Sequence, residues 1–326
     1  MGKIARQIQT PPTEISTTLR DAILERWIEE RQAIVPTLKP QDEVWREFWL
    51  YASIAHKWCP RMSALACALA QEGEVDPIKA ELLWLFEQGH AYHDLMQQKM
   101  LSSLPEGVLR GSWERTVKAQ VGTNLVHEER NPEVRAPSGI EVVRGWMSRP
   151  EGDGWRYVEP KVRLLKERIV VKVDGILAWP EEPIEVLEIK TEKLEARDSL
   201  NPKLGGKPRP QHILQTNLGM FATGLDRGRI VYIFKGAESL KNGMIEHVIE
   251  RDDDLIADAR RTALKCVEAV QTVEAARDGG MALEELLESV DEGYERLPEC
   301  PMKSKGRARF CDGRDACFPK GYRKKK

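Results

Sequence analysis

Apolar residues near the N-terminus recur at the spacing of one helical face, after two residues that can cap a helix, Ser16 and Thr17. The set comprises Leu19, Ile23, Trp27 and Ile28. An aromatic-rich segment over residues 43–56 is also expected to be helical. A further helix is expected to start at Asp76-Pro77 and to run towards Leu101. The first third of the chain is therefore predicted to be helical.

Between residues 105 and 190 the pattern changes to short alternating runs separated by Gly and Pro, which is typical of strands. Residues 141–143 and 155–165 are two such runs. An apolar run over residues 169–173 ends at Asp174, and a second run over residues 184–187 leads into Glu188. A Pro-rich turn separates these two runs, so they are predicted to be neighbouring strands.

The remaining chain alternates between helix and strand. Three prolines and two glycines over residues 201–210 predict a mobile loop. A helix over 211–223, a strand over 229–234 and an amphipathic helix over 255–276 follow. The order of elements predicts an α/β fold with a mixed central β-sheet flanked by helices.

The composition is that of a globular chain: 326 residues, 41% hydrophobic and 31% charged. This length allows one large domain or two smaller ones. No apolar run approaches the ~20 residues of a membrane helix, and the polar start has no signal-peptide core. We therefore expect no membrane contact and a cytoplasmic location.

Charge is distributed unevenly along the chain. The net charge is −2, but residues 300–326 hold ten Lys and Arg against two Asp, which leaves +8 there and −10 on residues 1–299. A basic end on an acidic body is typical of a protein with a polyanionic partner. A basic tail that only aids solubility is the alternative.

The two strands that end near Asp174 and Glu188 carry the candidate chemistry. Because side chains alternate along a strand, Glu188 and Lys190 share one face, while Leu187 and Ile189 point into the core. Two carboxylates beside an amine are suited to metal-assisted phosphodiester hydrolysis, and the Ile189 carbonyl could add a ligand. The alternative is a surface strand pair whose charges face solvent.

These residues resemble the PD-(D/E)xK nuclease superfamily, in particular its RecB-like branch, which includes CRISPR-associated iron–sulfur exonucleases and phage recombination nucleases. The resemblance lies in Val-Asp-Gly-Ile-Leu at 173–177 and Leu-Glu-Ile-Lys-Thr at 187–191. Residues 159–163 look like the strand that precedes the aspartate strand. A restriction-endonuclease-like core is the fold that this resemblance implies.

Two helical motifs extend the resemblance. Gly89-x3-His93 matches a motif whose last histidine is a metal ligand, which implies His93 rather than His90. Gln215 matches the start of a Gln-x3-Tyr motif and is implied as a catalytic residue, although Gly219 stands at the tyrosine position. Without the resemblance, His93 would be read as a core or surface helix residue, and Gln215 as a surface one.

Six cysteines divide into two groups. Cys67 and Cys266 lie in apolar helical surroundings and are expected to be small core residues. Four others could bind a [4Fe–4S] cluster or a structural zinc as thiolates: Cys59, Cys300, Cys311 and Cys317. The iron–sulfur members resembled here have one Cys-Pro-Arg cysteine before the core and three after it. This chain keeps that order, with ten residues between the first two late cysteines where that group usually has two.

The resemblance implies three segments: an N-terminal helical extension over 1–48, a nuclease core over 49–299 and a Cys-containing basic tail over 300–326. The tail would form a C-terminal iron–sulfur staple that closes on Cys59. If it docks near the active site, four of its cations could contact DNA: Arg307, Arg309, Arg314 and Lys320.

The expected function is a deoxyribonuclease dependent on Mg²⁺ or Mn²⁺, in which Asp174, Glu188, Lys190 and Gln215 are catalytic. The resemblance favours an exonuclease acting on single-stranded DNA ends in recombination, repair or phage DNA processing. Recombination or replication proteins are further expected partners. An endonuclease on structured or duplex DNA and a catalytically inactive DNA-binding protein on the same fold remain the alternatives.

Overall fold

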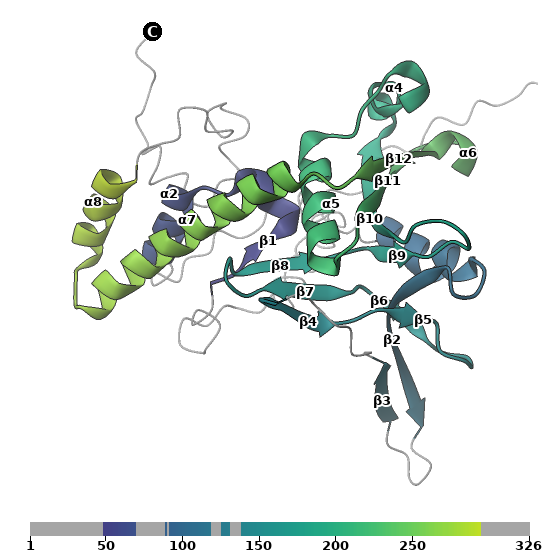
Figure 1. The fold of residues 1–326 in the computed structure, drawn as a ribbon, viewed down its shortest axis with the longest axis horizontal. Helices are drawn as coiled ribbons and strands as arrows, with labels where there is room; N and C mark the ends of the chain where they lie inside the picture. The colour runs from purple at the N-terminus through teal and green to yellow at the C-terminus, as the bar shows by residue number, and fades with distance from the viewer. Residues whose placement is uncertain (1–47, 70–88, 90, 119–124, 131–137, 295–326) are drawn as a thin grey trace, which may run out of the picture.

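The computed structural model describes residues 48–69, 89, 91–118, 125–130 and 138–294 (Figure 1). The helices expected before residue 48, the start of the helix at Asp76-Pro77 and the tail after residue 294 lie outside this part. The described residues form two β-sheets and a group of helices.

The larger sheet is mixed and has the strand order β12-β11-β10-β9-β2-β3. Its strands are β2 (Leu109–Lys118), β3 (Leu125–Arg130), β9 (Gly175–Leu177), β10 (Glu185–Lys193), β11 (Arg227–Lys235) and β12 (Met244–Glu250). The short strands β5 (Met147–Ser148) and β6 (Arg156–Val158) also pair with β2. Among the described strands of this sheet, β10 and β11 form the one parallel pair, with Lys190 opposite Tyr232; the other pairs are antiparallel.

The smaller sheet has the order β1-β8-β7-β4. Its strands are β1 (Leu50–Tyr51), β4 (Ile140–Arg144), β7 (Lys161–Leu164) and β8 (Ile169–Lys172). The chain crosses from one sheet to the other at Asp174: the Val173 amide still bonds to Pro160, whereas Gly175 already pairs with Leu187 of β10. The single central sheet predicted from the sequence is therefore divided in two at its candidate aspartate.

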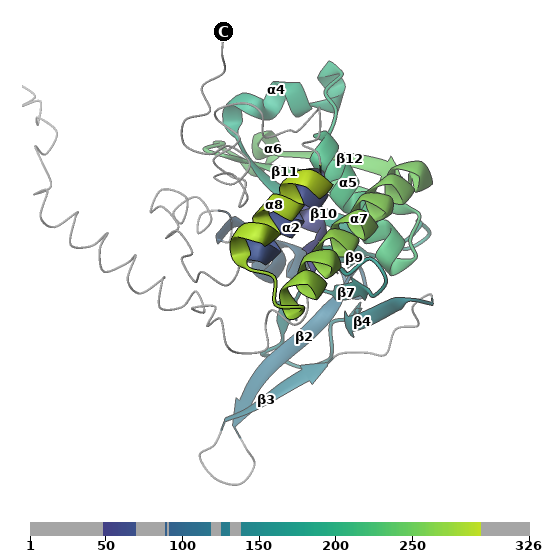
Figure 2. The ribbon, with the colours of Figure 1, turned by 90° about the vertical axis from the view of Figure 1, so that its left-hand side faces the viewer.

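Helices pack against both sheets (Figure 2). Helix α5 (Pro210–Thr223) packs on β10 and β11, and the 3₁₀ helix η2 (Ala52–Lys57) packs on α5. Helix α7 (Asp253–Asp278) contacts α5 and packs with α2 (Pro60–Leu69) and α8 (Leu283–Gly293). Shorter elements complete the fold: η3 (Met96–Met100), η4 (Leu101–Ser103), η5 (Leu194–Ala196), α4 (Arg197–Leu200), η6 (Pro202–Leu204) and α6 (Leu240–Gly243).

Both faces of β10 are buried, because apolar residues cover each side. Val186 packs with Leu218 of α5 in one core cluster, whereas Leu187 and Ile189 pack with Val231 in another. The predicted alternation is therefore present, but the face of Glu188 is not a solvent face: Glu188 is only 2% exposed.

Most of the described elements agree with the sequence. The runs over 141–143 and 155–165 correspond to β4 and to β6 with β7, and those over 211–223, 229–234 and 255–276 correspond to α5, β11 and α7. The helical segment expected over 43–56 is wrong at Leu50 and Tyr51, which pair in parallel with β8, whereas residues 52–56 lie in the 3₁₀ helix η2. Across the described residues, no helix is both long enough and apolar enough to cross a bilayer.

Candidate metal and catalytic site

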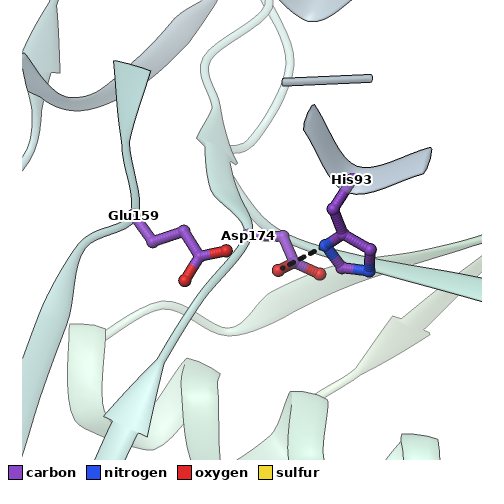
Figure 3. Close-up of side chains that lie close together, drawn as sticks. All are labelled: His93, Glu159 and Asp174. Atoms are coloured by element: carbon purple, nitrogen blue, oxygen red, sulfur yellow. Dashed lines mark ion pairs between the residues drawn. The ribbon is translucent and has the colours of Figure 1, made fainter. Parts of the chain in front are cut away.

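Three side chains from separate parts of the chain converge at the junction of the sheets (Figure 3). His93 comes from the helical segment before η3, Glu159 lies between β6 and β7, and Asp174 lies between β8 and β9. Their candidate ligand atoms all lie within 4.8 Å of one another. His93 Nδ1 is 3.5 Å from Asp174 Oδ1.

Buried hydrogen bonds fix the position of Asp174. Its carboxylate Oδ2 accepts from the Ile189 amide at 2.6 Å, and its backbone carbonyl accepts from the Tyr157 hydroxyl at 3.0 Å. The Gln97 amide nitrogen bridges this carbonyl, at 3.3 Å, and Glu159 Oε1, at 3.1 Å. Asp174 and Glu159 are thus held together by a shared donor before any ion binds.

The charges of this group are mutually dependent. Burial by itself would raise the pKa of Asp174, but the hydrogen bond and charge of His93, with Lys190 and the Ile189 amide, hold it below its usual value. Burial also opposes protonation of His93, whereas Asp174, Glu188 and Glu159 raise its pKa above the usual value. Each of these two side chains therefore stabilises the charged form of the other.

Glu188 and Lys190 form a second, deeper pair. Lys190 Nζ lies 2.5 Å from Glu188 Oε1 and donates to Gln215 Oε1 at 2.9 Å. Burial, with the nearby charge of Asp174, raises the pKa of Glu188 to about 7, although Lys190 acts in the opposite direction. Burial opposes the charge of Lys190, yet Glu188 and Asp174 raise its pKa, so the ammonium stays protonated. The site combines a charged amine with a carboxylate whose ionisation would be aided by a cation.

Helix α5 meets the sheet through three successive polar pairs. Gln215 binds Lys190, His212 Nδ1 lies 2.9 Å from the Tyr232 hydroxyl, and Arg209 binds Glu192 through two bonds of 2.5 and 3.0 Å. The Arg209 amide also donates to the Tyr232 hydroxyl. These pairs fix the first turns of α5 and hold Gln215 over Lys190.

The structure gives a reason for glycine at position 219, where the resembled motif has tyrosine. A Cβ atom at Gly219 would lie 3.1 Å from Val173 Cγ1 and 3.2 Å from Val186 Cγ1. The backbone of α5 thus packs directly on the strands, and a large side chain has no room at this position. Gly219 contributes to close packing rather than to the polar site.

Several sequence-predicted site residues are adjacent in space: His93 with Asp174, and Glu188 with Lys190 and Gln215. Ile189 reaches the site through its amide, while its side chain packs in the opposite core; its carbonyl as a ligand stays a prediction. Sequence reasoning missed Glu159 as a ligand. The available signal was its place directly before Pro160, ahead of the strand that precedes Asp174.

The cysteines are described only in part. Cys67 and Cys266 are buried, as predicted, and burial raises the pKa of Cys266 to about 11, which keeps its thiol protonated. Cys59 lies directly before α2 and is partly buried. The other three candidate cluster ligands and the four tail cations proposed to contact DNA lie beyond residue 294, outside the described residues.

No family model matches the chain, and no curated protein matches it. Among solved structures, it is similar to the alkaline exonuclease LHK-Exo from Laribacter hongkongensis, with 15% identity, a TM-score of 0.39 and coverage of 71% of this chain and 93% of that one. The same exonuclease in complex with dAMP is 14% identical, with a TM-score of 0.32 and coverage of 69% of this chain and 98% of that one. The structure of SSO0001 is 14% identical, with a TM-score of 0.34 and coverage of 77% of this chain and 86% of that one. These likenesses are weak, so the functional argument rests on the residues of the site.

Proposed function

We propose that this chain is a nuclease that depends on a divalent metal ion and hydrolyses DNA phosphodiester bonds. One observation carries the proposal: His93, Glu159 and Asp174 converge within 4.8 Å, and the buried Glu188–Lys190 pair is close enough for its charges to act on Asp174. Carboxylates and an imidazole at one point can hold a metal ion, and a protonated amine nearby can stabilise charge on a phosphate, so the group is suited to metal-assisted phosphate hydrolysis.

The donor set fits Mg²⁺ or Mn²⁺. Both ions favour oxygen ligands, and Mg²⁺ in particular needs only one or two protein carboxylates because it keeps several waters. Several carboxylates close together repel one another, and a bound cation would offset that repulsion. We infer that Asp174, Glu159 and His93 hold the ion, with Glu188 beside them.

The bound ion would neutralise charge on the phosphate and lower the pKa of water. Lys190 then has the positioning role: its ammonium is fixed by Glu188 and Gln215 and can donate to the attacking water or to a phosphate oxygen. Water would attack phosphorus and lose its proton to solvent as the ester P–O bond breaks, and the leaving oxygen would take a proton from solvent. Negative charge would develop where the Lys190 ammonium can stabilise it. Gln215 serves to orient Lys190.

We further propose that the enzyme acts on the ends of single-stranded DNA, in recombination, repair or phage DNA processing. The sequence resemblance supports this finer assignment. Linear and circular labelled single strands should be incubated with wild type and Asp174→Asn in Mn²⁺. The proposal predicts that wild type degrades the linear strand and leaves the circle intact. Asp174→Asn should degrade neither strand.

Each other outcome selects an alternative. A nicked circle indicates an endonuclease. Binding without cleavage by wild type indicates an inactive DNA-binding protein on a nuclease-like fold. Equal cleavage by wild type and Asp174→Asn would show that the catalytic site lies elsewhere.

We also propose that Cys59, Cys300, Cys311 and Cys317 bind a [4Fe–4S] cluster or a zinc ion. Support comes from the end of the described chain: the Arg61 guanidinium donates to the carbonyls of Val290 at 3.4 Å and Tyr294 at 2.8 Å. Arg61 is two residues from Cys59, and the six residues from Tyr294 to Cys300 can span about 20 Å. The tail can therefore reach Cys59.

Absorption and metal content of anaerobically purified protein test this staple. A brown protein with broad absorption near ~400 nm indicates the cluster, whereas a colourless protein with stoichiometric zinc indicates zinc. Cys59→Ser should lose the metal in either case. Wild type with neither metal would contradict the proposal, and with it the placement of the four tail cations, Arg307, Arg309, Arg314 and Lys320, near bound DNA.

A further inference from the structure

Residues 194–209 connect β10 to α5. This connection begins after the strand that carries Glu188 and Lys190 and ends at the helix that carries Gln215. Lys193, the last residue of β10, lies about 10 Å along the strand from Lys190 at ~3.3 Å per residue. Helix α4, part of this connection, lies at one extremity of the molecule in both views (Figures 1 and 2).

The base of the connection is anchored to the sheet. Leu200 is buried, and its carbonyl accepts from His247 Nε2 of β12 at 2.7 Å. At the other end, Arg209 binds Glu192 through two hydrogen bonds. The connection is therefore anchored to the sheet at two points, Leu200 and Arg209.

The tip is a preorganised turn. The Asn201 side chain accepts from the Lys203 amide at 3.0 Å, and the Gly206 amide donates to the Asn201 carbonyl at 2.8 Å. Gly205 is left-handed with φ of 77°, and a Cβ at Gly206 would lie 2.6 Å from the Asn201 nitrogen. Both glycines are required by this geometry, since a side chain would be strained at the first and clash with backbone at the second.

This turn presents an apolar side chain between two cations. Leu204 is 65% exposed, the largest exposed fraction of any large apolar side chain among the described residues. Lys203 and Lys207 are exposed beside it, and within the described part of the chain no ion pair joins either lysine to a carboxylate. Arg209, by contrast, is paired with Glu192 and acts as an anchor.

The charge of the connection differs from that of the rest of the chain. Residues 194–209 hold four Lys and Arg against two acidic residues, whereas residues 1–299 as a whole carry −10. A local positive surface on the connection between β10 and α5, the two elements that carry Lys190 and Gln215, would attract a polyanion to that part of the molecule. A side chain on a rigid turn also loses little conformational freedom on binding.

We propose that the 194–209 connection binds the nucleic-acid strand beside the catalytic site, with Lys203 and Lys207 on phosphates and Leu204 against a base. The inference rests on the proposed nuclease function and extends it to the substrate-binding surface. Cations on phosphates give affinity without sequence preference, and an apolar side chain can pack on any base.

The test is the binding of fluorescein-labelled oligothymidylate in EDTA, where no cleavage occurs, followed by anisotropy over a range of salt concentrations. Each phosphate contact on a single strand contributes about 0.7 to the slope of log K against log salt, so Lys203→Gln/Lys207→Gln should lower the slope by about 1.4 and the affinity about 25-fold near ~0.1 M salt. The matched control, Lys166→Gln/Lys265→Gln, removes two exposed lysines from other surfaces and should bind like wild type.

The leucine is tested separately. Leu204→Ala should weaken binding about threefold or more without a change in slope, because it removes an apolar contact and no charge. Leu165→Ala removes a leucine that is 50% exposed in the turn between β7 and β8 and should have no effect.

The outcomes separate this inference from the proposed function. If wild type cleaves DNA with Mn²⁺ but the lysine variant binds like wild type, the surface assignment is wrong. If both lysine pairs weaken binding equally, or if wild type does not bind the oligonucleotide, it is also overturned. If wild type binds and the lysine variant alone weakens binding, but no cleavage occurs with Mn²⁺, the nuclease proposal fails while the surface stands.

Discussion

Glu159→Gln tests the metal site with two effects of opposite sign. Glu159 places a second carboxylate within 4.8 Å of the Asp174 carboxylate. At that separation, two unit charges repel by about 0.9 kcal/mol in bulk water and about 3.5 kcal/mol at an effective dielectric constant of 20. Because Glu159 is partly exposed and His93 compensates part of the charge, we expect a value near the lower figure.

Without metal, the variant should therefore be as stable as wild type or more stable, by up to about 1 kcal/mol. The Gln97 amide can still donate to the new side-chain oxygen, so the local geometry is retained. In Mn²⁺ the substitution is unfavourable instead, because the variant lacks one ligand to the ion and binds it less tightly. We expect at least a tenfold loss of Mn²⁺ affinity, or about 1.4 kcal/mol.

Calorimetric titration with Mn²⁺ measures the affinity, and chemical unfolding in EDTA measures the stability. The matched control is Glu141→Gln, which removes a carboxylate that is 46% exposed and paired with Arg163 at 3.4 Å. Glu141→Gln should leave Mn²⁺ affinity unchanged. If Glu159→Gln binds Mn²⁺ as tightly as wild type, the convergence of His93, Glu159 and Asp174 does not form the metal site.

Two further predictions concern packing and pH. Burial, with Lys190 nearby, lowers the pKa of His212 to about 3. Below pH 6.5 the unfolded state therefore binds more protons at this histidine than the folded state does. Its contribution to the unfolding free energy should fall by about 1.4 kcal/mol from pH 7.5 to pH 5.5. His212→Gln should lose that part of the pH dependence, and an unchanged slope would contradict the assignment. Gly219→Leu should destabilise the protein by about 3 kcal/mol or more through overpacking against the two valines, whereas Gly293→Ala, which meets open space, should change stability by less than about 0.5 kcal/mol. Chemical unfolding of wild type and both glycine variants measures these changes. A Gly219→Leu variant as stable as wild type would refute the close packing of α5.

The parts of the fold that the sequence predicted are encoded locally. Alternation over residues 184–190 is enough to place Glu188 and Lys190 on one face, because period-two patterning needs no knowledge of distant strands. Helical spacing likewise predicted α5 and α7 within a few residues of their bounds.

The parts that it did not predict depend on distant pairing. The division of the sheets at Asp174 arises because β8 pairs with β7, while β9 pairs with β10 and with β2, more than 60 residues earlier in the chain. Glu159 becomes a candidate ligand only through that arrangement. The contact of Gly219 with Val173 and Val186 also depends on how closely α5 approaches the strands.

The most direct test of the central claim is digestion of end-labelled single-stranded DNA by wild type and Lys190→Ala in Mn²⁺. Lys172→Ala, which removes an exposed lysine at the end of β8, is the matched control. We predict that wild type and Lys172→Ala degrade the strand, and that Lys190→Ala is slower by at least about 100-fold, because a positioned donor to the developing charge is lost. Equal rates for Lys190→Ala and wild type, or no metal-dependent cleavage by wild type, would contradict the account.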